Sequence, residues 1–134
     1  MVSEPGFPLC FFFLLSKSFL CFFLMASENT ATTDESQNPS SSFYLHPGEN
    51  PGATLVNIQL DGSNYHAWSR AMKRALISKN KHKFLDGSVK TPTHGTILHD
   101  AWERCNMMVI LWLTRAMNTQ IAQSVVYIEN AKDL

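Results

Sequence analysis

The fold is decided at Leu60-Asp61-Gly62-Ser63-Asn64-Tyr65-His66-Ala67-Trp68, where a turn leads into a helix. Asp61-Gly62 is a typical turn pair, because glycine adopts backbone conformations that other residues avoid. Ser63 or Asn64 then offers a side-chain oxygen that can accept a hydrogen bond from an amide of the first helical turn. The block therefore predicts a helix that begins after Asn64 and runs to about Asn80.

The apolar residues that follow have the spacing of a helix with one buried face. Tyr65, Trp68, Met72 and Leu76 recur every three or four residues, which is the period of an amphipathic helix. We therefore expect both aromatic side chains to face the core. Buried rings are not available to stack on unpaired bases.

A second helix is expected from about Thr96 to Met117. Its apolar stripe consists of Leu98, Ala101, Trp102, Cys105, Val109, Trp112, Leu113 and Ala116. Ile110 and Leu111 add apolar groups on the other side, so we expect the second half to be buried on more than one face.

Shorter helices are expected beyond this point. Asn118 or Thr119 is a suitable N-cap for one, and Asn130 for another. Since residues 131–134 make scarcely one turn, the helical domain is expected to be incomplete at its C-terminal end.

The fold class predicted is mainly α, with at most one short strand or hairpin. The strand candidate is residues 55–60, where apolar and polar side chains alternate. The predicted core consists of Tyr65, Trp68, Met72, Leu76, Trp102, Cys105, Val109 and Trp112.

Three segments are expected along the chain of 134 residues, which is long enough for one small domain. Residues 1–24 are an apolar N-terminal segment, and residues 43–134 are the helical domain. Residues 25–42 contain many Ser, Thr and Asn residues and little to bury, so we expect a disordered linker.

The apolar run at residues 7–25 has three interpretations. It is translated upstream sequence if the natural start is Met25, a secretory or membrane segment, or a buried helix. Lys17 interrupts the run, and Glu4 rather than a basic residue precedes it, which disfavours a signal peptide. A small residue at Ala26 suits signal-peptidase cleavage, so the secretory alternative stays open.

Composition and spacing offer little to catalysis or metal binding. Lys plus Arg and Asp plus Glu each number 11, so the chain has no net charge that would attract nucleic acid or membrane. His94, His99 and Cys105 lack the paired spacing of a structural zinc site. Ser63 and His66 lack an orienting carboxylate, and no phosphate-binding loop occurs. We expect no enzyme activity, no cofactor, no metal and no small-molecule substrate.

A basic cluster is the candidate site for nucleic acid. Six cations fall in a stretch without Asp or Glu: Arg70, Lys73, Arg74, Lys79, Lys81 and Lys83. The first three share a helical face, which can neutralise phosphates of RNA. A solvated face or another acidic partner explains the same pattern.

An ordered set of short segments resembles the N-terminal Gag region of plant copia-type retrotransposons. The segments are Phe43-Tyr44-Leu45-His46-Pro47, Asn50-Pro51-Gly52, Leu60 to Trp68, Ala75 to Lys81, Phe84 to Ser88, Ala101 to Asn106 and Ile121 to Val125. Each is weak alone, but their order is specific, and together they extend over residues 43–134.

The resemblance implies a small helical, capsid-like Gag fragment with a structural role and no catalytic residues. In the family this region belongs to a polyprotein that assembles into cytoplasmic particles around RNA. Self-association and a cytoplasmic location are therefore expected. An RNA-binding module and a small secreted or membrane-anchored protein are the alternatives. The sequence lacks the zinc knuckle, protease, integrase and reverse transcriptase of a complete element.

Overall fold

The computed structural model describes residues 34–134, and the apolar run at residues 7–25 lies outside them. The described residues form α2 (Tyr65–Ser78), α3 (Ile97–Arg115) and α4 (Thr119–Ser124), with the short 3-10 helices η1 (Glu35–Gln37), η2 (His82–Phe84) and η3 (Ala131–Asp133). The mainly α prediction is confirmed. Within residues 34–134, no helix combines the length and the apolarity needed to cross a bilayer.

The start of α2 is held by a turn rather than by the expected side-chain cap. Asn64 occupies the N-cap position, but its side chain makes no capping bond. Its Oδ1 accepts from the Asp61 amide at 3.1 Å, and its Nδ2 donates to the Gln59 carbonyl at 2.7 Å. Asp61 Oδ1 in turn accepts from the amide and the hydroxyl of Ser63, both at 2.8 Å. The predicted capping role was wrong because these side chains bond within the turn.

The end of α2 explains why the helix stops at Ser78. Asn80 has a positive φ of 56°, a conformation that asparagine tolerates better than most residues. The Lys81 amide donates to the Leu76 carbonyl at 2.8 Å, and the Asn80 amide donates to the Ile77 carbonyl at 2.9 Å. This is the Schellman arrangement, which satisfies the last helical carbonyls.

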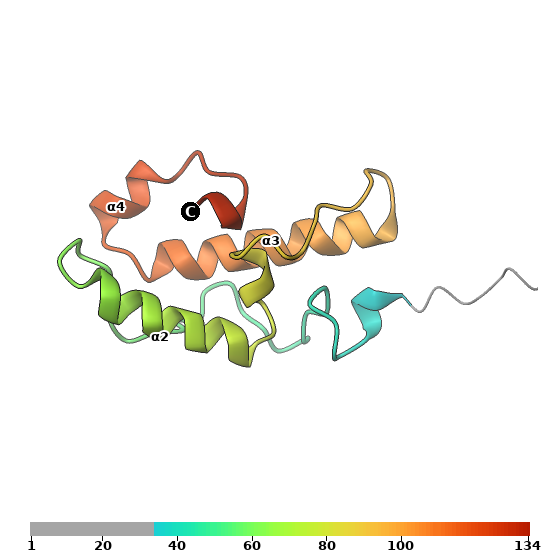
Figure 1. The fold of residues 1–134 in the computed structure, drawn as a ribbon, viewed down its shortest axis with the longest axis horizontal. Coiled ribbons are helices and arrows are strands. Elements are labelled where there is room, and N and C mark those ends of the chain that lie inside the picture. The colour runs from blue at the N-terminus through green and yellow to red at the C-terminus, as the bar shows by residue number, and fades with distance from the viewer. Residues whose placement is uncertain (1–33) are drawn as a thin grey trace, which may run out of the picture. The chain divides into compact units, whose positions relative to one another are not determined.

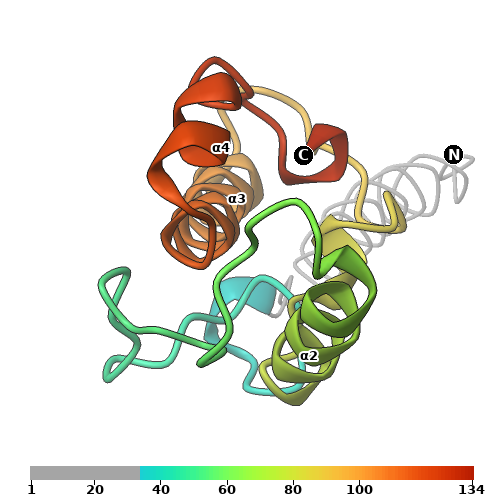
Figure 2. The same ribbon diagram turned by 90° about the vertical axis from the view of Figure 1, so that its left-hand side faces the viewer.

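The core lies between α2 and α3, which run antiparallel (Figure 1). Thr96 caps α3, because its Oγ1 accepts from the His99 amide at 3.1 Å. In the end-on view, α2 and α4 lie on different sides of α3 (Figure 2). The buried cluster includes Trp68, Met72 and Leu76 from α2, Cys105, Val109 and Trp112 from α3, and Phe84 from η2.

The carbonyl of Ala116 ties the opening block to the end of α3. It accepts from the Trp68 indole N–H at 2.9 Å and from the Leu60 amide at 2.8 Å. Asn118 completes the link by donating its amide to the Leu60 carbonyl at 2.9 Å. One block of sequence thus positions both the start of α2 and the end of α3.

The expected strand at residues 55–60 does not form. Its contact is a single parallel bridge between Leu60 and Met117. Val56 and Leu60 are buried, but Ile58 is 45% exposed, so the alternation does not continue. A strand needs hydrogen bonds to a partner strand along its length. Within residues 34–134, this segment forms one bridge, between Leu60 and Met117 just after α3, which is too little for a strand.

Three core predictions need correction. Tyr65 is 56% exposed, because it is the first residue of α2 and its ring lies at the edge of Trp68, with centroids 6.5 Å apart. Trp102 is only partly buried at the margin of the core. Leu111 is 47% exposed, so the second half of α3 is not enclosed on every side.

Residues 34–42 have a defined conformation, although we expected them to belong to a disordered linker. Asn80 Nδ2 donates to the Ser40 carbonyl at 2.9 Å, and Lys81 Nζ donates to the Ser42 carbonyl at 2.9 Å. Asp34 also caps η1 by accepting from the Ser36 amide. Contacts with residues about forty positions away order a segment that has little apolar surface of its own.

The C-terminal segment is anchored on α3 through Asn106. Its Nδ2 donates to the Glu129 carbonyl at 2.7 Å, and its Oδ1 accepts from the Ala131 amide at 2.9 Å. Asn118 caps α4 by accepting from the Ile121 amide, as predicted. Asn130 precedes η3 without a side-chain capping bond.

Candidate interaction surfaces

The six basic residues of the predicted nucleic-acid site fall into different environments. Arg70, Lys73 and Arg74 are exposed on α2, and none of them forms an ion pair within residues 34–134. Lys83 is also exposed, in η2. These four side chains are free to meet a polyanion.

Lys79 is committed to contacts within the fold. Its Nζ lies 3.4 Å from Glu49 Oε1 and 5.1 Å from the centroid of the Trp112 ring. Ion pairing and a cation–π contact both lower its availability to an external anion. Lys79 is therefore less available to an external polyanion than the four exposed cations.

Lys81 is a buried structural residue and not a nucleic-acid contact, which corrects the sequence prediction. It is 1% exposed, and its ammonium donates to the carbonyls of Ser42 and Tyr44. Burial lowers the pKa of Lys81, while the nearby Cys105 and Glu49 oppose that shift. Its position follows from the Schellman turn, which directs the chain inward after α2.

Cys105 holds the same segment from α3. Its thiol donates to the Phe43 carbonyl at 3.2 Å, between the two carbonyls bound by Lys81. Burial raises the pKa of the Cys105 thiol, so the thiol stays protonated near neutral pH, in the form that donates this bond. Phe43 and Tyr44 are thus fixed by polar contacts from two elements.

Ser63 and His66 do not form a nucleophile and base pair. The Ser63 hydroxyl donates to Asp61, and the His66 ring is exposed next to Tyr65, with centroids 5.8 Å apart. Asp61 therefore orders a turn rather than orienting a catalytic histidine.

The Asp61 carboxylate provides a pH-dependent test of this turn. The hydrogen bond from the Ser63 side chain lowers the pKa of Asp61 below its ordinary 3.8. Because the pKa of Asp61 is lower in the folded chain than in the unfolded chain, the ionised carboxylate stabilises the fold at pH values above 3.8. This stabilisation is lost as the pH falls through the pKa of Asp61 in the folded chain. Ser63→Ala should raise the pKa of Asp61 in a carboxyl NMR titration. Asp86, which accepts similarly from Ser88, should not change, and an unchanged Asp61 would refute the arrangement.

The exposed face of α3 carries apolar and charged residues in a regular order. Met107 is 43% exposed and Leu111 is 47% exposed, one helical turn apart. Glu103 and Arg115 are exposed one turn before and one turn after them, and neither forms an ion pair in the described part of the chain. We call these four residues the α3 face. Sequence reasoning did not identify Met107 as exposed, because apolar residues on a helix normally indicate burial.

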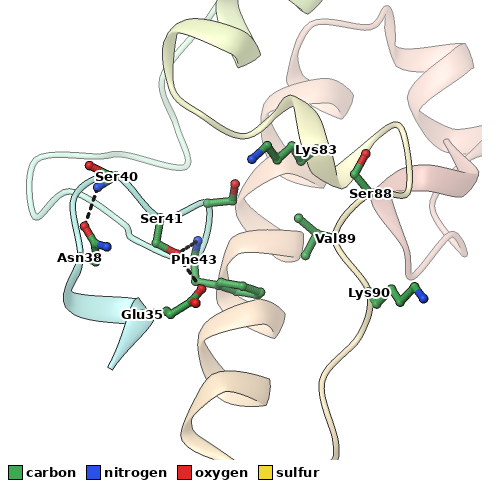
Figure 3. A pocket seen from close by; sticks show the side chains of 10 residues that line it. Glu35, Asn38, Ser40, Ser41, Phe43, Lys83, Ser88, Val89 and Lys90 are labelled. Carbon is green, nitrogen blue, oxygen red and sulfur yellow. Dashed lines mark hydrogen bonds between the residues drawn. The ribbon is translucent and has the colours of Figure 1, made fainter. Parts of the chain in front are cut away.

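A shallow groove of about 670 Å³ lies beside η1 and the segment after η2 (Figure 3). Its lining is mostly polar, with Phe43 and Val89 as apolar exceptions. The side chains belong to Glu35, Asn38, Ser40, Ser41, Ser42, Phe43, Lys83, Ser88, Val89 and Lys90. Two lysines and one carboxylate do not define a catalytic arrangement.

The structure groups no metal-binding set within residues 34–134. Of the three residues considered for zinc, His94 and His99 have rings whose centroids lie 4.1 Å apart. Cys105 does not join them, because its thiol donates to the Phe43 carbonyl.

Two residues with clear roles were missed by sequence reasoning. Glu49 pairs with Lys79 from a Pro and Gly-rich turn, and Asn106 anchors the C-terminal segment from the middle of α3. A glutamate in a turn is normally solvated, so nothing in the sequence around Glu49 indicated its ion pair with Lys79. Asn106 had a weak signal, because asparagine within a helix often has a specific partner.

Comparison with known families supports the resemblance over part of the chain. Residues 46–93 match the family described as Gag-polypeptide of LTR copia-type. The match includes α2 and η2 and ends before α3, so the resemblance of residues 101–106 and 121–125 stays a prediction. No curated protein and no solved structure matches the chain. Residues 46–93 are therefore a copia-type Gag region.

Proposed function

We propose that the chain is a non-catalytic structural subunit of Gag type that self-associates in the cytoplasm through the α3 face. The copia-type Gag region supports the structural role. The observation that carries the proposal is the exposure of Met107 and Leu111 one helical turn apart on α3. Exposed apolar residues side by side on one helix favour contact with another protein surface.

The order of charges on the α3 face favours a second copy as the partner. In an antiparallel pair of α3 helices centred near Val109, Met107 of one copy meets Leu111 of the other. Glu103 then meets Arg115 of the second copy, since both lie six residues from the centre. A twofold axis produces each of these contacts twice.

The small area of the α3 face limits the affinity expected. Glu103 and Arg115 are about 18 Å apart along the helix at 1.5 Å per residue. Stable interfaces bury about 1,200–2,000 Å² in total, more than one helical face provides. We therefore expect a reversible dimer with a dissociation constant of about 10 μM or weaker, an affinity class typical of small interfaces.

Sedimentation velocity of the full chain over a range of concentrations tests the proposal. The sedimentation coefficient should rise with concentration. Leu111→Glu should weaken dimerisation at least about tenfold, since each copy loses an apolar contact and gains a charge near the axis. Ile77→Glu is the matched control, because Ile77 is 56% exposed on α2. A wild-type chain that stays monomeric, or equal effects of the two changes, would contradict the proposal.

RNA binding is the second candidate function, favoured by Arg70, Lys73 and Arg74, which are exposed and without ion pairs in residues 34–134. They lie three and four residues apart, so they share one face of α2. The full chain should bind single-stranded RNA weakly at low salt and lose affinity as salt rises, because phosphate contacts release counterions.

Fluorescence anisotropy with a labelled RNA measures this second function. The triple change of Arg70, Lys73 and Arg74 to Gln should reduce affinity about tenfold or more and flatten the salt dependence. Arg104→Gln, which removes an exposed cation of α3, is the control. RNA affinity that the triple change leaves intact would exclude the α2 face.

A further inference from the structure

Trp102 has a polar group that the fold itself does not satisfy. The ring is partly buried on α3 and packs against the core, but its indole N–H is buried without a hydrogen-bond partner in the described part of the chain. The other two tryptophans donate to backbone carbonyls, Trp68 to Ala116 and Trp112 to Asn50. A buried donor without an acceptor costs about 1–3 kcal/mol, so this N–H needs an explanation.

A small pocket adjoins Trp102. It has a volume of about 190 Å³ and is more enclosed than the groove beside η1. Its walls come from the segment after η2, from α3 and from the C-terminal segment. The lining residues are Phe84, Gly87, Val89, Lys90, Thr91, Trp102, Asn106, Asn130 and Lys132.

The charged side chains that line this pocket have one sign. Lys90 and Lys132 line it from separate segments, and the lining includes no Asp or Glu. Neither lysine forms an ion pair within residues 34–134. Asn130 adds an amide that makes no capping bond, while the Asn106 amide is already used by Glu129 and Ala131.

We propose that this pocket binds a small oxyanion, either a phosphate or a carboxylate group. Two ammonium groups supply the charge, and the Asn130 amide supplies a neutral donor. The Trp102 N–H, which is closed to solvent in this structure, joins them when the ring turns toward the pocket. An oxyanion offers several acceptors to such donors at once, and its hydrogen bonds to charged groups are the stronger kind. An apolar ligand would leave the same donors unsatisfied, which favours the anion.

NMR of the ¹⁵N-labelled full chain tests the pocket through the three indole N–H signals. Trp102→Phe identifies the Trp102 signal. Titration with inorganic phosphate should move that signal in a saturable way at millimolar concentration, while the Trp68 and Trp112 signals stay in place. Sodium acetate forms a second arm at matched ionic strength. The tighter of the two anions identifies the ligand as phosphoryl or carboxylate, and saturation by either supports the oxyanion.

Charge variants connect the signal to the pocket. Lys90→Gln and Lys132→Gln should each weaken binding at least threefold, and the double variant should abolish saturation. Arg104→Gln is the control, because it removes an exposed cation of α3 that lines neither the pocket nor the basic face of α2. The proposal is wrong if sodium chloride at equal ionic strength produces the same shift, if no shift occurs, or if the double variant binds like the wild type.

Discussion

Replacing Trp68 with alanine is expected to lower the free energy of unfolding by about 3–5 kcal/mol, while Tyr65→Ala lowers it by less than about 1 kcal/mol. Both aromatic residues stand in the same block of sequence. Trp68 is 6% exposed and donates its indole N–H to Ala116, whereas Tyr65 is 56% exposed. The sequence pattern assigns both residues to the core, whereas the structure buries Trp68 alone, and the two losses of stability should differ accordingly.

Urea unfolding of the two variants provides the comparison, with circular dichroism and the fluorescence of the remaining tryptophans as probes. A third variant, Trp68→Phe, keeps most of the apolar ring and removes the N–H. Trp68→Phe should lower the free energy of unfolding by about 1–2 kcal/mol, mainly because the Ala116 carbonyl loses the hydrogen bond from the indole. Equal losses for Tyr65→Ala and Trp68→Ala would show that the tyrosine is part of the core after all.

Replacing Lys81 with methionine is expected to destabilise the fold by about 2–4 kcal/mol, because two buried carbonyls lose their donor and each costs about 1–3 kcal/mol. The acceptors are the carbonyls of Ser42 and Tyr44. Methionine retains much of the length of the lysine stem, so the lost packing is small. Protection of the Phe43 and Tyr44 region against hydrogen exchange should fall as well.

A counter-effect makes the Lys81 result informative. Burial lowers the pKa of Lys81, so the fold disfavours the charged amine, and removal of a buried charge sometimes stabilises a protein. Since the two carbonyls remain buried, we expect the loss of hydrogen bonds to dominate. Lys83→Met, at an exposed position in η2, should change stability by less than about 0.5 kcal/mol. A Lys81→Met chain more stable than wild type would show that removing the buried charge outweighs losing the two hydrogen bonds.

The helices were predictable because their signals are local. The periodic apolar residues located α2 and α3, and Thr96 and Asn118 cap α3 and α4 with their own side chains. The strand at residues 55–60 was not excluded by its pattern, because a strand depends on a partner elsewhere in the chain. Its failure follows from the end of α3, which offers Leu60 one bridge.

The candidate surfaces were less predictable because they depend on long-range contacts. Six cations close in sequence suggested one basic site, but Lys79 pairs with Glu49 and Lys81 enters the core. Neither partner is near in sequence. Conversely, the exposed position of Leu111 depends on which neighbours pack against α3. A pattern of residue types does not contain that information.

A charge exchange on the α3 face tests the proposed self-association of the chain most directly. Glu103→Arg and Arg115→Glu should each weaken dimerisation about tenfold, since each places like charges opposite one another twice. The double variant Glu103→Arg with Arg115→Glu restores opposite charges and should dimerise within about twofold of wild type, on the same electrostatic argument. Sedimentation equilibrium measures all four chains. A double variant as weak as either single variant, or no effect of any change, would contradict an antiparallel pairing of α3 between two copies.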